Sequence, residues 1–180
     1  MKPIPNFDTV QATGDFERLA PGGYVLKITE ATDDPKKEYL KIVYDIAEGP
    51  EKGRYSDEWA QKNKYAHAFY RSYKEKAAGM FKAFTNALEE SNDGYKWSWK
   101  EATLNGKLIG AVIAEEEYMN DRGEIKTRLY VNSVMSADRI RKGDFRVPAL
   151  KLYKEKPSDG MKPAADVSFM EKLSDDDLPF

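Results

Sequence analysis

The sequence contains no cysteine and a single histidine, His67. Without cysteine there can be no disulfide, no thiolate nucleophile and no cysteine-ligated zinc, and this composition fits a reducing cytosol. A single histidine also excludes metal sites built from clustered histidines, so a Ser-His-Asp triad is the histidine-based site that stays open. The phosphate-binding motifs GxxxxGK[ST] and GxGxxG do not occur. We therefore predict a protein without cofactor or metal.

Long hydrophobic runs are missing as well. No window approaches the ~18 apolar residues of a membrane-spanning helix, and the opening MKPIPNFDTV lacks the apolar segment of a signal peptide. We expect a cytoplasmic protein that has no membrane partner. The 180 residues are enough for one domain with a hydrophobic core and a tail.

Charge is distributed unevenly along the chain. Segment 166–180 contains five acidic residues and only one lysine, whereas the rest of the chain carries a small positive excess. A basic body with an acidic tail often accompanies nucleic-acid binding, although this excess is too weak to establish it.

Alternating apolar residues predict strands in the first half of the chain. Segments 24–29 and 39–46 alternate on either side of the polar turn DDPKK, which is typical of a hairpin with one buried face. Segment 64–73 is predicted to be a third strand. Aromatic residues occupy both of its alternating positions, so its inward face stays open.

The second half adds a helix and two more strands. Apolar spacing predicts an amphipathic helix over 77–88, and two strands follow at 107–118 and 125–135. Five strands with one helix between the third and fourth give the element order of the OB-fold, a small barrel that binds oligonucleotides. The predicted fold class is therefore mainly β, a five-stranded OB-fold barrel with a disordered acidic tail.

A short helix, ADRIRK, is expected after the barrel, with Ser136 as its cap and Gly143 past its end. The apolar residues around and after it are expected to lie back on the barrel. They are Ile140, Phe145, Val147 and Leu150. From Lys154 the chain is rich in Pro, Lys, Asp and Ala, which favours disorder. We predict a binding domain over 1–153, a flexible linker over 154–173 and a tip over 174–180.

The segment between the second and third strands interleaves aromatic and basic residues. Single-stranded nucleic acid needs both, because unpaired bases stack on aromatic faces and cations neutralise the phosphates. The candidate binding residues of this segment are Arg54, Tyr55, Trp59, Lys62, Lys64, Tyr65, Phe69, Tyr70, Arg71 and Lys74. Four more are expected on the outward positions of strands, namely Tyr39, Lys41, Arg128 and Tyr130. Many of these rings would serve equally as core or strand-pairing residues.

Other motifs have competing interpretations. Trp97 and Trp99 alternate with lysines and fit either a second stacking site or, preferably, a lid on the barrel. His67 is expected to be a strand residue and not a catalyst, because no Ser or Asp surrounds it in a catalytic motif. The segment Glu124–Lys126 matches the E-x-K element of metal-dependent nucleases but lacks the required upstream acid. We therefore expect a protein that is not an enzyme.

The chain closes on SDDDLPF, in which an aromatic residue follows consecutive acids. This end resembles the acidic tip of bacterial single-stranded DNA-binding proteins, which typically reads Asp-Asp-Asp-Ile-Pro-Phe. The resemblance implies that the tip recruits replication, recombination and repair proteins, whose pockets take the terminal phenylalanine. The residues carrying this role would be Asp175, Asp176, Asp177, Leu178, Pro179 and Phe180.

The body is similar to a group of single-stranded DNA-binding proteins encoded by phages of Gram-positive bacteria. The similarity lies in YLKIVYDIAEG, SYKEKAAGMFKAF and GEIKTRLYVNSV. It implies a protein that coats single-stranded DNA in phage replication or recombination, inside an infected or lysogenic host. The sequence of the body differs from that of the bacterial proteins. We therefore expect a dimer and not the tetramer that is usual for them. The alternatives are an RNA-binding protein or a strand-annealing or recombination accessory factor.

Overall fold

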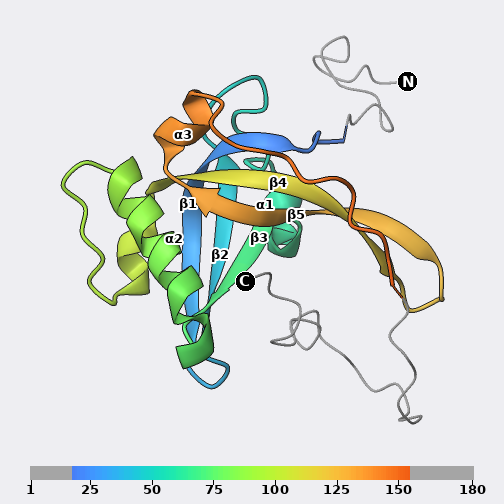
Figure 1. The fold of residues 1–180 in the computed structure, drawn as a ribbon, viewed down its shortest axis with the longest axis horizontal. Helices are drawn as coiled ribbons and strands as arrows, with labels where there is room; N and C mark the ends of the chain where they lie inside the picture. Colours follow the sequence, from blue (N-terminus) through green and yellow to red (C-terminus); the bar gives the residue numbers. More distant parts are fainter. Residues whose placement is uncertain (1–17, 155–180) are drawn as a thin grey trace, which may run out of the picture.

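The structure is a computed structural model that describes residues 18–154. Residues 155–173 of the predicted linker and the whole tip, 174–180, lie outside the described residues. In chain order the elements are β1 (Gly22–Asp34), β2 (Tyr39–Ile46), α1 (Glu58–Lys62), the 3-10 helix η2 (Lys64–His67), β3 (Ala68–Ser72), η3 (Glu75–Ala77), α2 (Ala78–Ser91), η4 (Glu101–Leu104), β4 (Leu108–Met119), β5 (Ile125–Met135) and α3 (Ala137–Arg141) (Figure 1).

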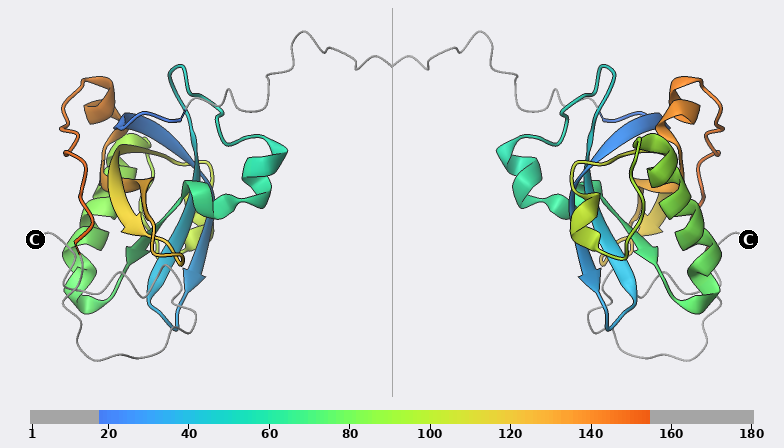
Figure 2. Two further views of the ribbon diagram at one scale, coloured as in Figure 1. Left: turned by 90° about the vertical axis from the view of Figure 1, so that its right-hand side faces the viewer. Right: turned by 90° about the vertical axis from the view of Figure 1, so that its left-hand side faces the viewer.

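The five strands form one antiparallel sheet in the order β3-β2-β1-β4-β5. Strand β1 pairs with β2 along its second half and with β4 along its first half, and it lies at the centre of the sheet. The sheet bends around its core, as the side views in Figure 2 show. The chain is therefore mainly β, as predicted, and its architecture is compatible with an OB-like fold.

Helix α2 covers the core between the two edges of the sheet. It contacts β3, β4 and β5. Its apolar side chains Phe81, Phe84 and Leu88 are buried in the main core cluster, as their spacing predicts. Helix and strands thus bury one continuous set of apolar side chains.

Helix α3 packs on the other side of the sheet, against a smaller apolar cluster (Figure 1). The close approach requires glycine on the strands: a Cβ at Gly110 would lie 2.6 Å from Ile140, and one at Gly23 would lie 2.4 Å from Phe145. Ile140, Phe145 and Val147 return to the sheet as predicted. Leu150 is 40% exposed and belongs to neither core cluster, but the next residue, Lys151, pairs with β4.

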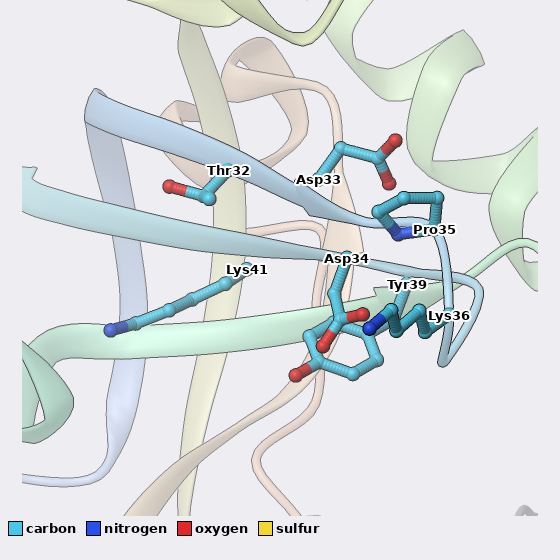
Figure 3. A pocket seen from close by; sticks show the side chains of 7 residues that line it. All are labelled: Thr32, Asp33, Asp34, Pro35, Lys36, Tyr39 and Lys41. Carbon is cyan, nitrogen blue, oxygen red and sulfur yellow. The ribbon is translucent and has the colours of Figure 1, made fainter.

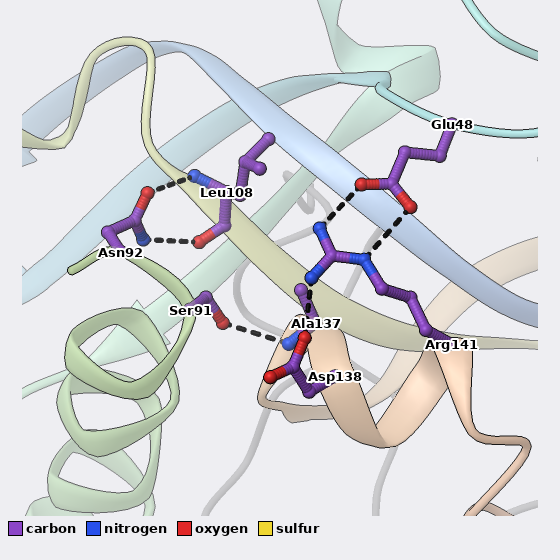
Figure 4. A network of polar contacts seen from close by, with 7 residues as sticks. All are labelled: Glu48, Ser91, Asn92, Leu108, Ala137, Asp138 and Arg141. Atoms are coloured by element: carbon purple, nitrogen blue, oxygen red, sulfur yellow. Dashed lines mark hydrogen bonds and ion pairs between the residues drawn. The ribbon is translucent and has the colours of Figure 1, made fainter.

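Polar side chains fasten these layers together (Figure 4). The Asn92 amide, at the end of α2, donates to the carbonyl of Leu108 and accepts from its backbone N–H. Ser136 precedes α3 but makes no capping hydrogen bond with its side chain. The Oγ of Ser91 instead accepts from the N–H of Ala137, which ties the start of α3 to α2.

The third strand is shorter than predicted, because residues 64–67 form η2 and β3 begins at Ala68. The segment between β2 and η2 also contains a short helix. The Asp57 side chain accepts from the N–H of Ala60 and caps the short helix α1, which ends at Asn63. His67 therefore lies in a 3-10 turn and not in a strand, and it is buried there.

Candidate nucleic-acid interface

The outward face of β2 and β3 brings together three of the predicted residues. In the antiparallel register Lys41 lies opposite Tyr70, and Tyr39 lies opposite Ser72, so both tyrosines and the lysine share one face. The Tyr39 and Tyr70 rings meet edge to face with centroids 5.4 Å apart. All three side chains are only partly buried. They form an aromatic and basic surface that solvent can reach.

Strand β1 and its turn extend this face on the far side of β2. A shallow pocket of about 350 Å³ lies there, next to Tyr39 and Lys41 (Figure 3). The pocket is lined by Thr32, Asp33, Asp34, Pro35, Lys36, Tyr39 and Lys41. The close-up shows Tyr39 beside Asp34 and Lys36, while Lys41 extends along the sheet and Asp33 points to the opposite side.

The tyrosines of this face stay neutral at physiological pH. Burial raises the pKa of Tyr39 above 10.0, and the hydrogen bond with Asp34 raises it further. Burial likewise raises the pKa of Tyr70. A neutral phenol ring does not repel phosphates, so both rings are suited to stacking on bases.

The basic residues around this face divide into paired and unpaired groups. Arg54 is bonded to Glu51, Lys62 to Glu58 and Lys64 to Glu30. Within residues 18–154, no carboxylate lies within ion-pair distance of the cationic groups of Lys41, Arg71 and Lys74. On the outward face, the Lys41 ammonium is therefore available to a phosphate without first losing a carboxylate partner.

Arg71 occupies the inward side of β3, opposite the buried Leu40. Its guanidinium lies 4.8 Å from the centroid of the Phe69 ring and donates to the carbonyl of Tyr70. Burial lowers the pKa of Arg71 to about 10, so the side chain is still cationic at neutral pH. It is a desolvated positive charge at the edge of the sheet.

Two predicted aromatic residues belong to the core instead of the surface. Phe69 is only 5% exposed and packs against Phe84 with ring centroids 6.2 Å apart. Tyr55 packs on the core and stacks on His67 at 4.7 Å. This answers the question of the inward face of β3, since Phe69 points in and Tyr70 points out. We therefore leave Phe69 and Tyr55 out of the interface.

Trp59 and Tyr65 lie on the helical segment between β2 and β3 and are open to solvent. Their exposed fractions are 61% and 72%. The Tyr65 hydroxyl donates to Asn63, while Trp59 belongs to α1. These two rings are the exposed aromatic groups of the predicted segment, beside the β2–β3 surface.

Arg128 and Tyr130 lie elsewhere, on the β4–β5 hairpin, which projects away from the other strands (Figure 1). The Arg128 guanidinium donates to Glu116 at 2.6 Å and lies 4.9 Å from the centroid of Tyr118. Tyr130 donates its hydroxyl to Asn132, and burial, with Glu116 nearby, raises its pKa. The predicted residues thus form two separate clusters.

The remaining motifs gain no catalytic geometry. Glu124 and Lys126 pair with each other at 3.3 Å at the β4–β5 turn. Among residues 18–154, no three His, Cys, Asp or Glu side chains are placed to hold a metal ion. In the same part of the chain no helix is long and apolar enough to cross a bilayer.

Sequence reasoning missed the β1 side of the pocket, Thr32 and Asp34. The predicted first strand ends at residue 29, whereas β1 continues to Asp34 past a bulge between Ile28 and Glu30. The prediction assigns Asp33 and Asp34 to the turn DDPKK, but in the structure both residues belong to β1.

Comparison of the chain with protein-family profiles and with curated protein sequences gives no match. The function is therefore argued from the geometry of the described residues and from the sequence.

Proposed function

We propose that this protein is a non-catalytic OB-fold protein that binds single-stranded DNA on the outward face of β1, β2 and β3. The observation that carries the proposal is the grouping of Tyr39, Lys41 and Tyr70 on one partly exposed face. Two neutral rings offer stacking surfaces, and Lys41 beside them, which has no carboxylate within ion-pair distance among residues 18–154, offers charge for the phosphates. Trp59 and Tyr65 extend the surface along the loop that follows β2.

The shape of the surface favours single strands over duplex DNA. Stacking on tyrosine requires bases whose faces are free, and a duplex keeps these faces covered. The pocket beside Tyr39 is shallow and open, as suits a chain that lies across a sheet instead of a small molecule enclosed by it. In the cell such a protein would coat single-stranded DNA during phage replication or recombination.

A titration with labelled poly-dT, duplex DNA and single-stranded RNA at two salt concentrations tests this proposal. We expect poly-dT to bind far more tightly than duplex, and its log affinity to fall with log salt by about 0.7 for each phosphate neutralised. Equal affinity for duplex DNA would refute the coating model. Tighter binding to RNA would favour the RNA-binding alternative.

We further propose that the tip, 174–180, recruits host or phage replication, recombination and repair proteins. This rests on the sequence, because the tip lies outside the described residues. One buried aromatic anchor can dominate a small interface, so deleting Phe180 alone is expected to abolish recruitment. A pull-down with the full chain and with the shortened chain measures this. Recovery of the same partners by both would reduce the tip to a solubilising acidic end.

A further inference from the structure

A third group of aromatic residues lies beside α2, on the loop that leads to β4. The Trp97 ring packs against the core cluster, as predicted for a lid. Trp99 contacts the core through the Phe81 ring but is 75% exposed. A tryptophan is seldom left so open in a folded domain. The two residues of the KWSWK motif therefore have different roles.

The backbone holds Trp99 in a conformation that bulky residues rarely adopt. Its φ is +60°, in the left-handed region that glycine and asparagine tolerate and aromatic residues avoid. Strain of this kind persists where the surroundings impose it, and it is concentrated at functional positions. The strained backbone therefore marks Trp99 as a candidate functional position.

The Trp99 ring is supported from one side and open on the other. It lies nearly parallel to the Phe81 ring, with centroids 5.9 Å apart and an interplanar angle of 20°. Trp97 lies 6.1 Å away at a tilt. The Glu89 carboxylate accepts from the backbone N–H of Trp97 and from the ammonium of Lys96, which holds this loop in place. Trp99 is thus a pre-positioned flat surface facing solvent.

Lysines neighbour this ring in sequence, since Lys100 follows Trp99 and Lys82 follows Phe81, on which the ring stacks. Lys82 and Lys100 are exposed, and among the described residues neither has a carboxylate within ion-pair distance. Lys96 is also exposed, although it pairs with Glu89 at 2.6 Å. An open aromatic face beside unpaired lysines suits an unpaired base and its phosphate better than an apolar protein segment.

The ring connects to the β1–β2 turn on the side of the sheet opposite the proposed interface. Tyr73 directly follows β3, and its hydroxyl donates to Asp33, which points away from Tyr39 and Lys41. From Tyr73 the next ring is Phe81 at 6.0 Å, and from Phe81 the next is Trp99 at 5.9 Å. These ring contacts run through the core, because Phe81 is only 6% exposed. A bound strand would therefore reach Trp99 over the surface, around the β1–β2 turn.

We infer that Trp99 is a second stacking position for single-stranded nucleic acid, reached by a strand that leaves the β1–β3 face past the β1–β2 turn. This inference rests on the proposed function and extends it. The β1–β3 face would bind short strands alone, and Trp99 would contribute only when the strand is long enough to pass the turn.

The test uses full-length protein and dT oligomers shorter and longer than the ~4–16 nucleotides that one OB fold covers. The variant is Trp99→Asn, because asparagine removes the ring and tolerates positive φ. We expect wild-type affinity for the short oligomers and a loss of about 5- to 100-fold for the long ones. Trp99→Phe, which keeps an aromatic face, should recover most of the loss.

The matched control is Leu152→Asn, which removes another exposed apolar side chain, at 61% exposure, from a different surface. It should bind every oligomer as wild type does. If Trp99→Asn binds all lengths like wild type, or loses the same factor at all lengths, the second position is refuted while the proposed function stands. If wild-type protein binds no oligomer, the proposed function fails and this inference fails with it.

Discussion

Two clusters of tyrosine and basic residues look alike in the sequence and differ in the structure. On the β1–β3 face, Lys41 lies opposite Tyr70, and no carboxylate among residues 18–154 pairs with it. On the β4–β5 hairpin, Arg128 lies opposite Glu116 and pairs with it, and Glu115 and Glu117 flank that acid. Among the described residues, Lys41 therefore carries a charge that no carboxylate neutralises, whereas the charge of Arg128 is already paired with Glu116.

The difference shows that the cross-strand partner decides what a basic residue can do. An ion pair holds the Arg128 guanidinium over the Tyr118 ring and covers part of that ring. A phosphate would have to displace Glu116, which pairs with Arg128 and also lies 3.9 Å from the ammonium of Lys151. We therefore expect nucleic acid on the first face and a structural role for the second.

The largest expected effect is the loss of a stacking ring. Tyr70→Ala should weaken binding of single-stranded DNA by about 1–3 kcal/mol, because each base stacked on an aromatic side chain is worth that much. Tyr130→Ala on the hairpin should leave affinity unchanged. Fluorescence anisotropy with a labelled dT oligomer measures both.

Each of these variants must first give the far-UV circular dichroism and the cooperative melting of the wild type. Equal losses in Tyr70→Ala and Tyr130→Ala would mean that both clusters bind DNA. A loss confined to Tyr130→Ala would reverse the comparison.

The next effect concerns charge. Lys41→Gln should reduce the slope of log affinity against log salt by about 0.7, the contribution of one phosphate contact on a single strand. Arg128→Gln should keep the wild-type slope and lower the free energy of unfolding by up to about 1 kcal/mol, because it removes a partly exposed ion pair. Titrations at several salt concentrations and urea melts separate the two outcomes. An unchanged slope in Lys41→Gln would remove this residue from the interface.

Acid should lower the stability of the fold at the turn before β3, where His67 is buried. Burial lowers the pKa of His67 below 6.5. Lys64 and Lys41 lower it further, whereas Asp45 and Asp57 partly oppose the shift. Since the folded state disfavours the protonated ring, its contribution to stability is complete above pH ~6.5 and declines as the pH falls toward the lower folded pKa. Melting temperatures of wild type and His67→Phe should therefore converge or cross between pH 7 and 5. Parallel curves would contradict this.

The smallest effect is that of the acidic tip on DNA binding. Deleting 174–180 should raise affinity slightly at low salt and leave it unchanged at high salt, because the acids compete weakly with DNA for the unpaired cations. In a Lys41→Gln background the gain should shrink. A gain that persists at high salt would point to a contact other than charge.

The fold was largely predictable because burial patterns are local in sequence. The strands at 39–46 and 125–135 have the predicted limits, and the spacing of Phe81, Phe84 and Leu88 gave the helix. Segment 64–67 was wrongly predicted as strand, since its aromatic residues favour a sheet. In the structure Asp57 caps α1, and the Asn63 carbonyl accepts from the N–H of Ala66, so the chain enters β3 through a 3-10 turn.

The candidate site was harder to predict, because composition does not say where a ring points or what a charge pairs with. Phe69 and Tyr70 are adjacent in sequence, yet one lies in the core and the other on the surface. The pairing of Lys64 with Glu30 joins residues far apart in the chain. The exposure of Trp99 depends on a loop conformation that no periodicity encodes.

The most direct test of the central claim is photocrosslinking of the full-length protein to a dT oligomer that carries iodouracil, followed by mass spectrometry of the crosslinked peptides. An aromatic side chain stacked on the modified base should form an adduct with it. The account predicts adducts on Tyr39 and Tyr70 and none on Tyr118 or Tyr130. Adducts on the β4–β5 hairpin with none on β2 and β3 would contradict it.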